Sequence, residues 1–542
     1  MKSAPFRLHC MIVSTGIALA GIPLGDAVAQ SFTGIGDLAP NPPFSSKAFA
    51  VSPDGLKVTG VTTIGDDDGA DGVPNTKAFV WSSGSGMTAL ASFSSSIYYG
   101  QGHGITNGGI VAGYGDSLDP EFFYQAGTPM RWDPNPTALA ELPAIWNNDS
   151  YLAGANAING SGAVIVGYAS DFDEGGNDRG IVWVNNIPQA LDWLNVSSEG
   201  PTIYVDYMYT GGVNTPGTNI VGASYNFTAD DGAANGQAVM WSDATAQWSS
   251  AAAKTPVGLG FVPGADQTAD GTTSGGNDVS NNGQLIVGYS ENGAINSAIP
   301  DETPLPAGRE VHVGFLVNGV LGGNPNPMIA LADIGSNNGS TDLQFAAATA
   351  VNGDASATSY VAVGWGYNGL HDLGGPEAND DGVDGTDLSR EALMWTPSGV
   401  QNIETFAASL GLNLTGWDLQ EATGISDNGC VIVGWGFNPQ GNSEGWVLSL
   451  PSSAIAGDFD LNGAVNGLDL AQWKGDFGGP GSDADGDNDS DGNDFLIWQR
   501  NFGAGPGVNA VPESNSAALI MIAGALVGFA GRLKSQPPGR RR

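Results

Sequence analysis

Oxygen-bearing side chains recur at the same spacing in two twelve-residue segments near the end of the chain. The first segment runs from Asp458 to Asp469 and the second from Asp483 to Asp494. A calcium ion takes six to eight oxygen ligands, and a twelve-residue loop supplies them from positions 1, 3, 5, 9 and 12 and from the backbone carbonyl of position 7. Both segments therefore predict a calcium-binding loop.

The two loops differ slightly in the residues that they offer. The first loop offers the side chains of Asp458, Asp460, Asn462, Asn466 and Asp469 and the carbonyl of Ala464. The second offers the side chains of Asp483, Asp485, Asp487, Asp491 and Asp494 and the carbonyl of Asp489. The sharp turn falls on Gly463 in the first loop and on Asn488 in the second, where a positive φ is less well tolerated.

Each loop leads into a short amphipathic pattern that predicts a helix. Its apolar residues are Leu470, Trp473 and Phe477 after the first loop, and Phe495, Trp498 and Phe502 after the second. An acidic linker would explain neither the repeated register nor the repeated aromatic residues. No helix pattern precedes either loop, which argues against an ordinary helix–loop–helix calcium hand.

The duplicated loops with their trailing helices resemble a dockerin-type module, a family that docks onto a cohesin partner. In that family loop positions 10 and 11 take part in recognition. Here they are Gly467-Leu468 and Gly492-Asn493 rather than a pair of small hydroxyl residues. The resemblance implies bound calcium, while the partner stays open between a cohesin-like protein and an anionic polysaccharide.

The composition indicates an exported, turn-rich β protein. The chain of 542 residues contains 83 glycines, only 13% charged residues and a net charge of −39. Nucleic acid is excluded as a partner, because binding to phosphates needs a basic surface. Cys430 lies in an apolar strand pattern and is predicted to be a small core residue.

From Ser31 to about Pro451 the chain repeats one unit seven times. Each unit has a turn with Ser or Asn, an apolar run that ends in glycine, and in most units a strand that ends in tryptophan. The marker glycines are Gly60, Gly113, Gly167, Gly222, Gly288, Gly364 and Gly434, and the tryptophans are Trp81, Trp132, Trp183, Trp241 and Trp395. These residues resemble the HAF repeat of bacterial extracellular proteins. Seven units of four short strands predict a β-propeller, with a β-solenoid as the alternative.

The ends of the repeat region predict that the propeller closes on itself. The seventh unit stops after a third strand at 445–450, and a spare strand at 32–38 precedes the first unit. Pairing these two segments would remove the exposed edges. Acidic residues gather in the loops that follow the marker glycines, as in 66–71 and 380–387, so we expect one strongly negative face.

Both ends of the chain carry targeting patterns. Residues 1–29 combine a basic start, an apolar stretch and Ala27-Val-Ala29, which predicts a secretory signal peptide. Residues 506–542 contain Val511-Pro-Glu513, an uncharged apolar run and terminal arginines. This tail resembles a PEP-CTERM sorting signal, which implies a transmembrane helix before processing and release to the cell surface or matrix.

The predicted organisation is a signal peptide (1–29), an all-β seven-bladed propeller (30–451), an α-helical calcium module (452–505) and a membrane-sorting tail (506–542). We expect an exported, non-catalytic protein of the cell surface or extracellular matrix that binds polysaccharide or protein partners. The alternative is a secreted polysaccharide-active hydrolase tethered by its module, since such chemistry needs only two carboxylates in space. A buried pair of carboxylates along the propeller axis would favour the enzyme, and small residues there would favour the binder.

Overall fold

The chain forms two compact units, residues 1–454 and 455–542. The computed structural model describes residues 30–39, 44–65, 75–92, 99–116, 127–134, 139–143, 145, 153–171, 177–194, 208–227, 234–265, 273–296, 309–321, 324–332, 346–353, 355–356, 359–367, 390–450, 457–459, 465–479, 482, 484 and 489–502. The predicted signal peptide and sorting tail lie outside these residues.

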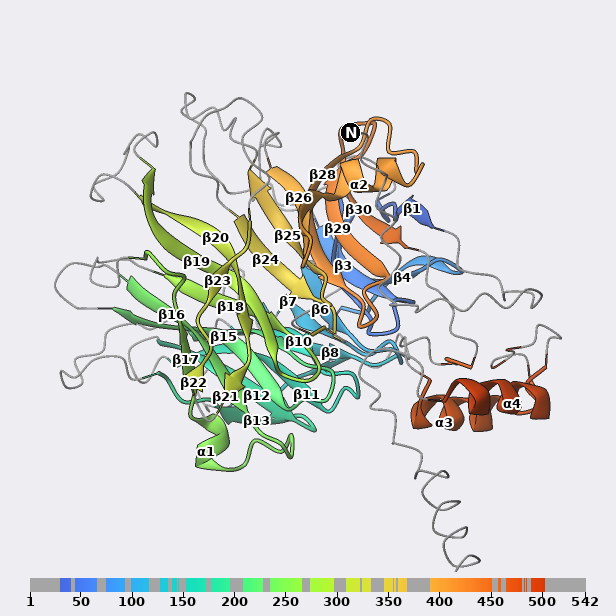
Figure 1. Ribbon diagram of the computed structural model, residues 1–542, viewed down its shortest axis with the longest axis horizontal. Helices are drawn as coiled ribbons and strands as arrows, with labels where there is room; N and C mark the ends of the chain where they lie inside the picture. Colours follow the sequence, from blue (N-terminus) through green and yellow to red (C-terminus); the bar gives the residue numbers. More distant parts are fainter. Residues whose placement is uncertain are drawn as a thin grey trace, which may run out of the picture. The chain divides into compact units, whose positions relative to one another are not determined.

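Seven four-stranded antiparallel sheets, the blades, follow one another in the described part of the first unit (Figure 1). Blades one to three are β2 (Ser46–Val51), β3 (Val58–Gly65), β4 (Asn75–Ser82) and β5 (Gly86–Ala89); β6 (Gly100–Ile105), β7 (Val111–Asp116), β8 (Gly127–Trp132) and β9 (Leu139–Glu141); and β10 (Ala153–Ile158), β11 (Val164–Asp171), β12 (Asn177–Val184) and β13 (Ile187–Ala190). Blades four and five are β14 (Met208–Val213), β15 (Asn219–Phe227), β16 (Ala234–Ser242) and β17 (Val257–Gly260); and β18 (Ser274–Val279), β19 (Leu285–Asn296), β20 (Arg309–Asn318) and β23 (Ile329–Ala330). Blades six and seven are β24 (Ala346–Val351), β25 (Ala362–Tyr367), β26 (Arg390–Thr396) and β27 (Gly399–Asn402); and β28 (Asp418–Ile425), β29 (Val431–Phe437), β30 (Ser443–Ser449) and β1 (Ser31–Gly34).

Three smaller features accompany the blades. They are a two-stranded ribbon of β21 (Val320–Leu321) and β22 (Asn324–Pro325), and the short helices α1 (Ala251–Lys254) and α2 (Ile403–Ser409). Asn402 caps α2 by accepting a hydrogen bond from the backbone N–H of Thr405, and Phe406 packs into the core beside it.

The blades form a closed ring, which confirms the predicted seven-bladed propeller. The first strand of each blade contacts the first strands of both neighbours, and β28 of blade seven contacts β2 of blade one. Seven clusters of buried apolar residues each join two successive blades, and one of them joins blades seven and one through Val433, Val447 and Phe79. The core therefore lies between the blades, as expected for units that cannot bury their own faces.

The marker glycines face a bulge in the first strand of their own blade. In each blade the marker glycine pairs with the residue just before the register shift, as Gly60 pairs with Ala48. A Cβ at Gly60 would lie 2.0 Å from the carbonyl oxygen of Lys47. Glycine is required there because the bulge brings the opposite backbone too close for any side chain.

The tryptophans that end the third strands tie each blade to the one before it. Trp132 donates its indole N–H to the carbonyl of Ala91, and Trp183 donates to that of Pro143, at 2.7 and 2.9 Å. Trp241 and Trp395 donate to Asp192 and Ala332 in the same way. Each accepting carbonyl follows the fourth strand of the preceding blade, so the repeated tryptophan bridges two blades with both its ring and its N–H.

Strand β1 completes blade seven, as the sequence predicted. It pairs antiparallel with β30, with Phe32 opposite Leu448 and Gly34 opposite Trp446, and the two strands lie side by side in Figure 1. Ile35 extends the pairing through its backbone N–H to the carbonyl of Gly445 and is itself buried. Residues from the two ends of the repeat region thus share one sheet.

The alternation of strand direction gives the ring two distinct ends. The tight turns between the first and second strands lie at one end, here called the turn end. The connections from second to third strands and from blade to blade lie at the other, here called the loop end. The predicted acidic loops 66–71 and 380–387 lie outside the described residues.

The described part of the second unit contains two short helices, α3 (Gly467–Asp476) and α4 (Gly492–Asn501). They begin within the two predicted calcium loops and carry Trp473, Phe495 and Trp498, while Phe477 and Phe502 follow directly after them. Trp473 and Phe495 lie 5.2 Å apart between ring centroids, and Phe495 and Trp498 lie 5.4 Å apart. No helix in the described residues is long and apolar enough to cross a membrane.

Candidate functional site

The two predicted calcium loops start their helices with the same hydrogen bonds. The side chain of Asn466 accepts the backbone N–H of Leu468 at 2.7 Å, and that of Asp491 accepts the N–H of Asn493 at 2.6 Å. Both helices also have a capping box, closed by Asp469 and Asp494. Positions 9 and 12 of each loop, which the sequence assigns to the metal, therefore also fix the start of a helix.

The carboxylates at position 12 are fully buried. Asp469 accepts the N–H of Phe459 on one oxygen and the N–H of Asn466 on the other, both at 2.7 Å. Asp494 accepts the N–H groups of Ala484 and Asp491 at the same distance. Each carboxylate thus holds a residue near the start of its loop, Phe459 or Ala484, against the helix that ends the loop.

Each loop is locked to the helix of the other loop. The indole N–H of Trp473, in α3, donates to the carbonyl of Asp491 at 2.9 Å. The indole N–H of Trp498, in α4, donates to the carbonyl of Asn466 at 2.8 Å. Because these carbonyls belong to position 9 of each loop, the shape of one loop depends on the position of the other.

The structure brings together three predicted ligand residues of the second loop. Oxygens of Asp489, Asp491 and Asp494 all lie within 4.8 Å of one another. The sequence assigns the carbonyl of Asp489 to the metal, whereas the side-chain carboxylate is the group that joins the other two here. Three converging carboxylates are the hard oxygen donors that calcium prefers, so these residues fit that ion.

The remaining predicted ligands divide into two sets. In the first loop Asp458 is buried, and Asn466 and Asp469 occupy the positions described above. The residues that lie outside the described part of the chain are Asp460, Asn462, Ala464, Asp483, Asp485 and Asp487.

Small residues dominate the first strands of the blades, and the carboxylates of Asp278 and Asp427 lie in and beside these strands. Asp278 follows the bulge of β18, where the other blades have the small residues Ala50, Gly104, Ala157, Gly212, Ala350 and Gly424. Asp427 lies in the tight turn after β28, at the turn end. Neither residue was predicted from the sequence, although an acid at a position otherwise held by alanine or glycine was a usable signal for Asp278.

Both carboxylates accept hydrogen bonds from other blades. Asp278 accepts the backbone N–H groups of Val279 and Val351 at 2.8 and 2.9 Å. Asp427 accepts the amide of Asn281 at 2.8 Å and the hydroxyl of Thr215 at 3.2 Å. These contacts connect blades four to seven across the turn end.

Burial governs the titration of the two carboxylates. It raises the pKa of Asp278 to about 7, and the nearby Asp427 raises it further, against the lowering effect of the two backbone donors. Burial likewise raises the pKa of Asp427 to about 6, against the lowering effect of Asn281 and Thr215. Carboxyl groups with such pKa values can exchange protons near neutral pH.

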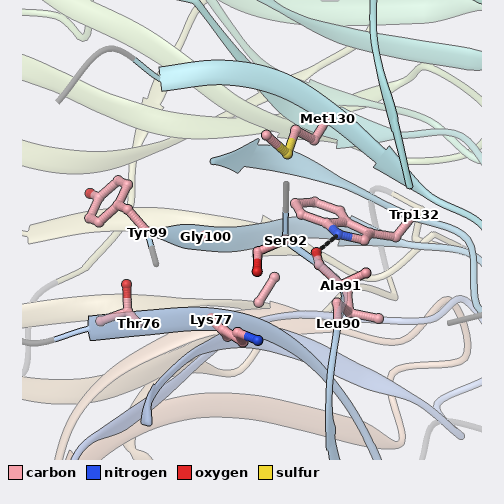
Figure 2. A pocket seen from close by; sticks show the side chains of 10 residues that line it. Thr76, Lys77, Leu90, Ala91, Ser92, Tyr99, Gly100, Met130 and Trp132 are labelled. Carbon is pink, nitrogen blue, oxygen red and sulfur yellow. Dashed lines mark hydrogen bonds between the residues drawn. The ribbon is translucent and has the colours of Figure 1, made fainter. Parts of the chain in front are cut away.

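A small pocket opens between blades one and two (Figure 2). Thr76, Tyr99, Met130 and Trp132 are among its lining residues, and the indole N–H of Trp132 points to the carbonyl of Ala91. Its volume of about 10 Å³ corresponds to a single water molecule. The pocket therefore has no room for a sugar or another organic ligand.

Comparisons with known proteins give only distant structural likenesses. No protein-family model matches the chain, and no curated protein matches it.

The β-propeller domain of the Trilobed protease from Pyrococcus furiosus is similar at 8% identity over 75% of this chain and 95% of that chain, with a TM-score of 0.41. An oligogalacturonate lyase from Vibrio parahaemolyticus is similar at 7% identity over 79% of this chain and 99% of that chain, with a TM-score of 0.37. A periplasmic gluconolactonase from Pseudomonas aeruginosa is similar at 11% identity over 76% and 97% of the two chains, with a TM-score of 0.30. Likeness of this degree carries no argument about activity.

Proposed function

We propose that the protein is an exported binding protein whose propeller presents the interaction surface and whose C-terminal module is held in shape by calcium. The observation that carries the calcium part is the convergence of Asp489, Asp491 and Asp494 at the start of α4. The matching hydrogen bonds at Asp469 and Asp494 extend the argument to both loops.

A bound calcium ion would supply the positive charge that the carboxylates of the loops need. Three carboxylates within 4.8 Å repel one another, and a divalent cation between them turns that repulsion into attraction. The energy of binding then becomes energy of folding for the loops and for the helices that they start. Because Trp473 and Trp498 each bond to the opposite loop, we expect the two sites to order together.

Hydrogen exchange of the full chain tests the calcium module. We expect the amides of α3 and α4 to exchange slowly in calcium and at least about tenfold faster in a chelator. Asp494→Asn should raise the calcium concentration needed for protection by about tenfold or more. Asp476→Asn, in the same module but outside the loops, is the matched control and should leave it unchanged. Equal exchange in calcium and chelator would refute the proposal.

A secreted polysaccharide-active hydrolase is the second candidate function. It is favoured by the two carboxyls near the axis, Asp278 and Asp427, with pKa values of about 7 and about 6. It is disfavoured by their hydrogen bonds, which run to the backbone and side chains of other blades. Turnover of a polysaccharide panel by the wild type, lost in Asp427→Asn, would establish the hydrolase. Binding without turnover would support the non-catalytic protein.

The proposed location is the cell surface or extracellular matrix. The signal pattern of residues 1–29 and the sorting pattern of residues 506–542 support it. The proposed partners are a cohesin-like protein for the module and polysaccharide for the propeller. Fractionation of cells that express the full chain or residues 1–505 tests the location. We expect the full chain in the envelope before release, and the shortened chain in the medium only.

A further inference from the structure

Two cationic side chains stack on indole rings where blades six, seven and one meet. The ammonium nitrogen of Lys47, in β2, lies 3.8 Å from the centroid of the Trp435 ring in β29. The guanidinium carbon of Arg390, at the start of β26, lies 4.2 Å from the Trp365 centroid and 6.0 Å from that of Trp435. Trp435 thus faces both cations, although the three residues come from three different blades.

The charges of this group do not balance. One oxygen of Glu421 accepts both Arg390, at 2.9 Å, and the indole N–H of Trp435, at 3.0 Å. In the described part of the chain no carboxylate lies within ion-pair distance of Lys47. The Nε–H of Arg390 is buried, and it has no hydrogen-bond partner among the residues that the structure describes. Two cations therefore share one anion, and one buried donor is left over.

Structural stability alone does not account for this surplus charge. Burial lowers the pKa of Lys47, Glu421 raises it and Arg390 lowers it again, so the fold disfavours the charged ammonium at this place. A cation–π contact returns only about 0.5–2 kcal/mol. A contact that served only to join the blades would be better made by a neutral or balanced pair. An external carboxylate beside Lys47 and Arg390 would supply the missing negative charge.

Aromatic residues recur at one position in the second strands of the blades. The residue after the marker glycine is Tyr114, Tyr168, Tyr289, Trp365 or Trp435 in five of the seven blades. At Gly154 and Gly275, their partners in the first strands, a Cβ would lie 2.9 and 2.6 Å from the rings of Tyr168 and Tyr289. These rings therefore lean over the innermost strands. Aromatic walls with a few fixed polar groups are typical of small-ligand sites, and flat rings suit the apolar faces of sugars.

We propose that Lys47 and Arg390 bind the carboxylate of an acidic sugar whose ring packs against these aromatic residues of the second strands. The proposal rests on the proposed binding function, and it specifies acidic sugars as the class of ligand that the propeller binds. The protein has a net charge of −39, which repels polyanions. Lys47 and Arg390 form a cationic position among the described residues, and this position would hold the acidic sugar units of such a polymer one at a time.

Titration of the full chain with D-glucuronate and D-glucose tests this proposal, because the two sugars differ in the carboxylate. At fixed calcium we expect glucuronate to quench the tryptophan fluorescence at a concentration at least about tenfold lower than glucose does. Lys47→Met keeps the length of the side chain and removes its charge, and it should weaken glucuronate binding about tenfold. Lys254→Met, in the remote helix α1, makes the same change and should have no effect.

Several results would overturn the proposal. They are equal binding of the two sugars, no binding of either, unchanged affinity in Lys47→Met, or acetate binding as tightly as glucuronate. If Lys47→Met fails to fold, Lys47→Arg takes its place and should retain the preference for glucuronate, since the positive charge remains. None of these results affects the calcium module, because hydrogen exchange in α3 and α4 reports on it separately.

Discussion

The marker glycines are fixed by a backbone contact within each blade. At Gly364 a Cβ would lie 2.0 Å from the carbonyl oxygen of Ala347, and that oxygen belongs to a strand that cannot move alone. We expect Gly364→Ala to lower the free energy of unfolding by about 3 kcal/mol. Gly84→Ala is the matched control, because no atom lies within 4 Å of its added Cβ. Urea unfolding at fixed calcium measures both, and equal midpoints would contradict the bulge explanation.

Asp427 makes the stability of the propeller depend on pH. Its pKa is about 6 in the folded protein and about 3.8 when unfolded, so the folded state holds the proton longer. Its contribution to stability is therefore fully present below about pH 3.8 and is lost as the pH rises through about 6. The loss amounts to as much as about 3 kcal/mol.

We expect Asp427→Asn to reduce the decline in stability between pH 5 and pH 8. The measurement is the difference between the urea midpoints of variant and wild type at the two pH values. Taking this difference removes opposing effects such as that of His103, whose pKa burial lowers to about 4. Asp133→Asn removes a surface carboxylate of the Arg131 pair and serves as the control. A parallel decline in Asp427→Asn and wild type would show that this carboxyl is not buried as described.

At the residue scale, prediction succeeded where the signal was local and failed where ring closure was needed. The loop residues Asn466, Asp469, Asp491 and Asp494 could be found because their spacing repeats within a short segment. Thr215 and Asp427 meet although 212 residues separate them. No short-range pattern encodes such a contact, because it exists only after blades four to seven have been placed. The grouping of Lys47 with Arg390 is unpredictable for the same reason.

At the element scale, the repeats predicted the strands well because each repeat is one blade. The apolar runs before the marker glycines are the second strands, and the tryptophan segments are the third strands. Cys430 was predicted to be a core residue, and it is buried. The bulge opposite each marker glycine was not predicted, since a glycine in a strand indicates either a bulge or a weak strand.

Strand β1 is the element whose removal should affect the whole ring. Deleting residues 30–39 would expose the edge of β30 from Trp446 to Ser449 and remove the buried Ile35. We expect the shortened protein to aggregate or to melt several degrees below the parent. Light scattering and a thermal melt measure this. If the shortened protein melts like its parent, closure of the ring by β1 contributes nothing to stability.

At the scale of the whole molecule, topology decides where the acidic loops emerge. In every blade the described second strand ends and the third strand begins at the loop end, so we expect the acidic loops between them to share one face. Loops after six of the seven marker glycines contain acidic residues. The local sequence predicts each loop's charge, but only the alternation of strand direction places the loops together.

The acidic loops predict that the propeller itself binds calcium. Each pair of like charges at 4 Å costs only about 1 kcal/mol in water, so isolated acidic residues need no ion. Clusters such as Asp66-Asp-Asp68 and Asp380-Asp381 are denser, and a divalent cation would relieve their repulsion. We expect residues 30–451 to bind a few calcium ions with dissociation constants of about 10⁻⁴–10⁻³ M, as other extracellular modules do. These ions would bridge the acidic face to anionic polysaccharide.

Isothermal titration of residues 30–451 measures the binding of calcium, with magnesium as the control. Without heat or a melting shift at millimolar calcium, the loops are solvated surface, and any polysaccharide must then reach the propeller through Lys47 and Arg390.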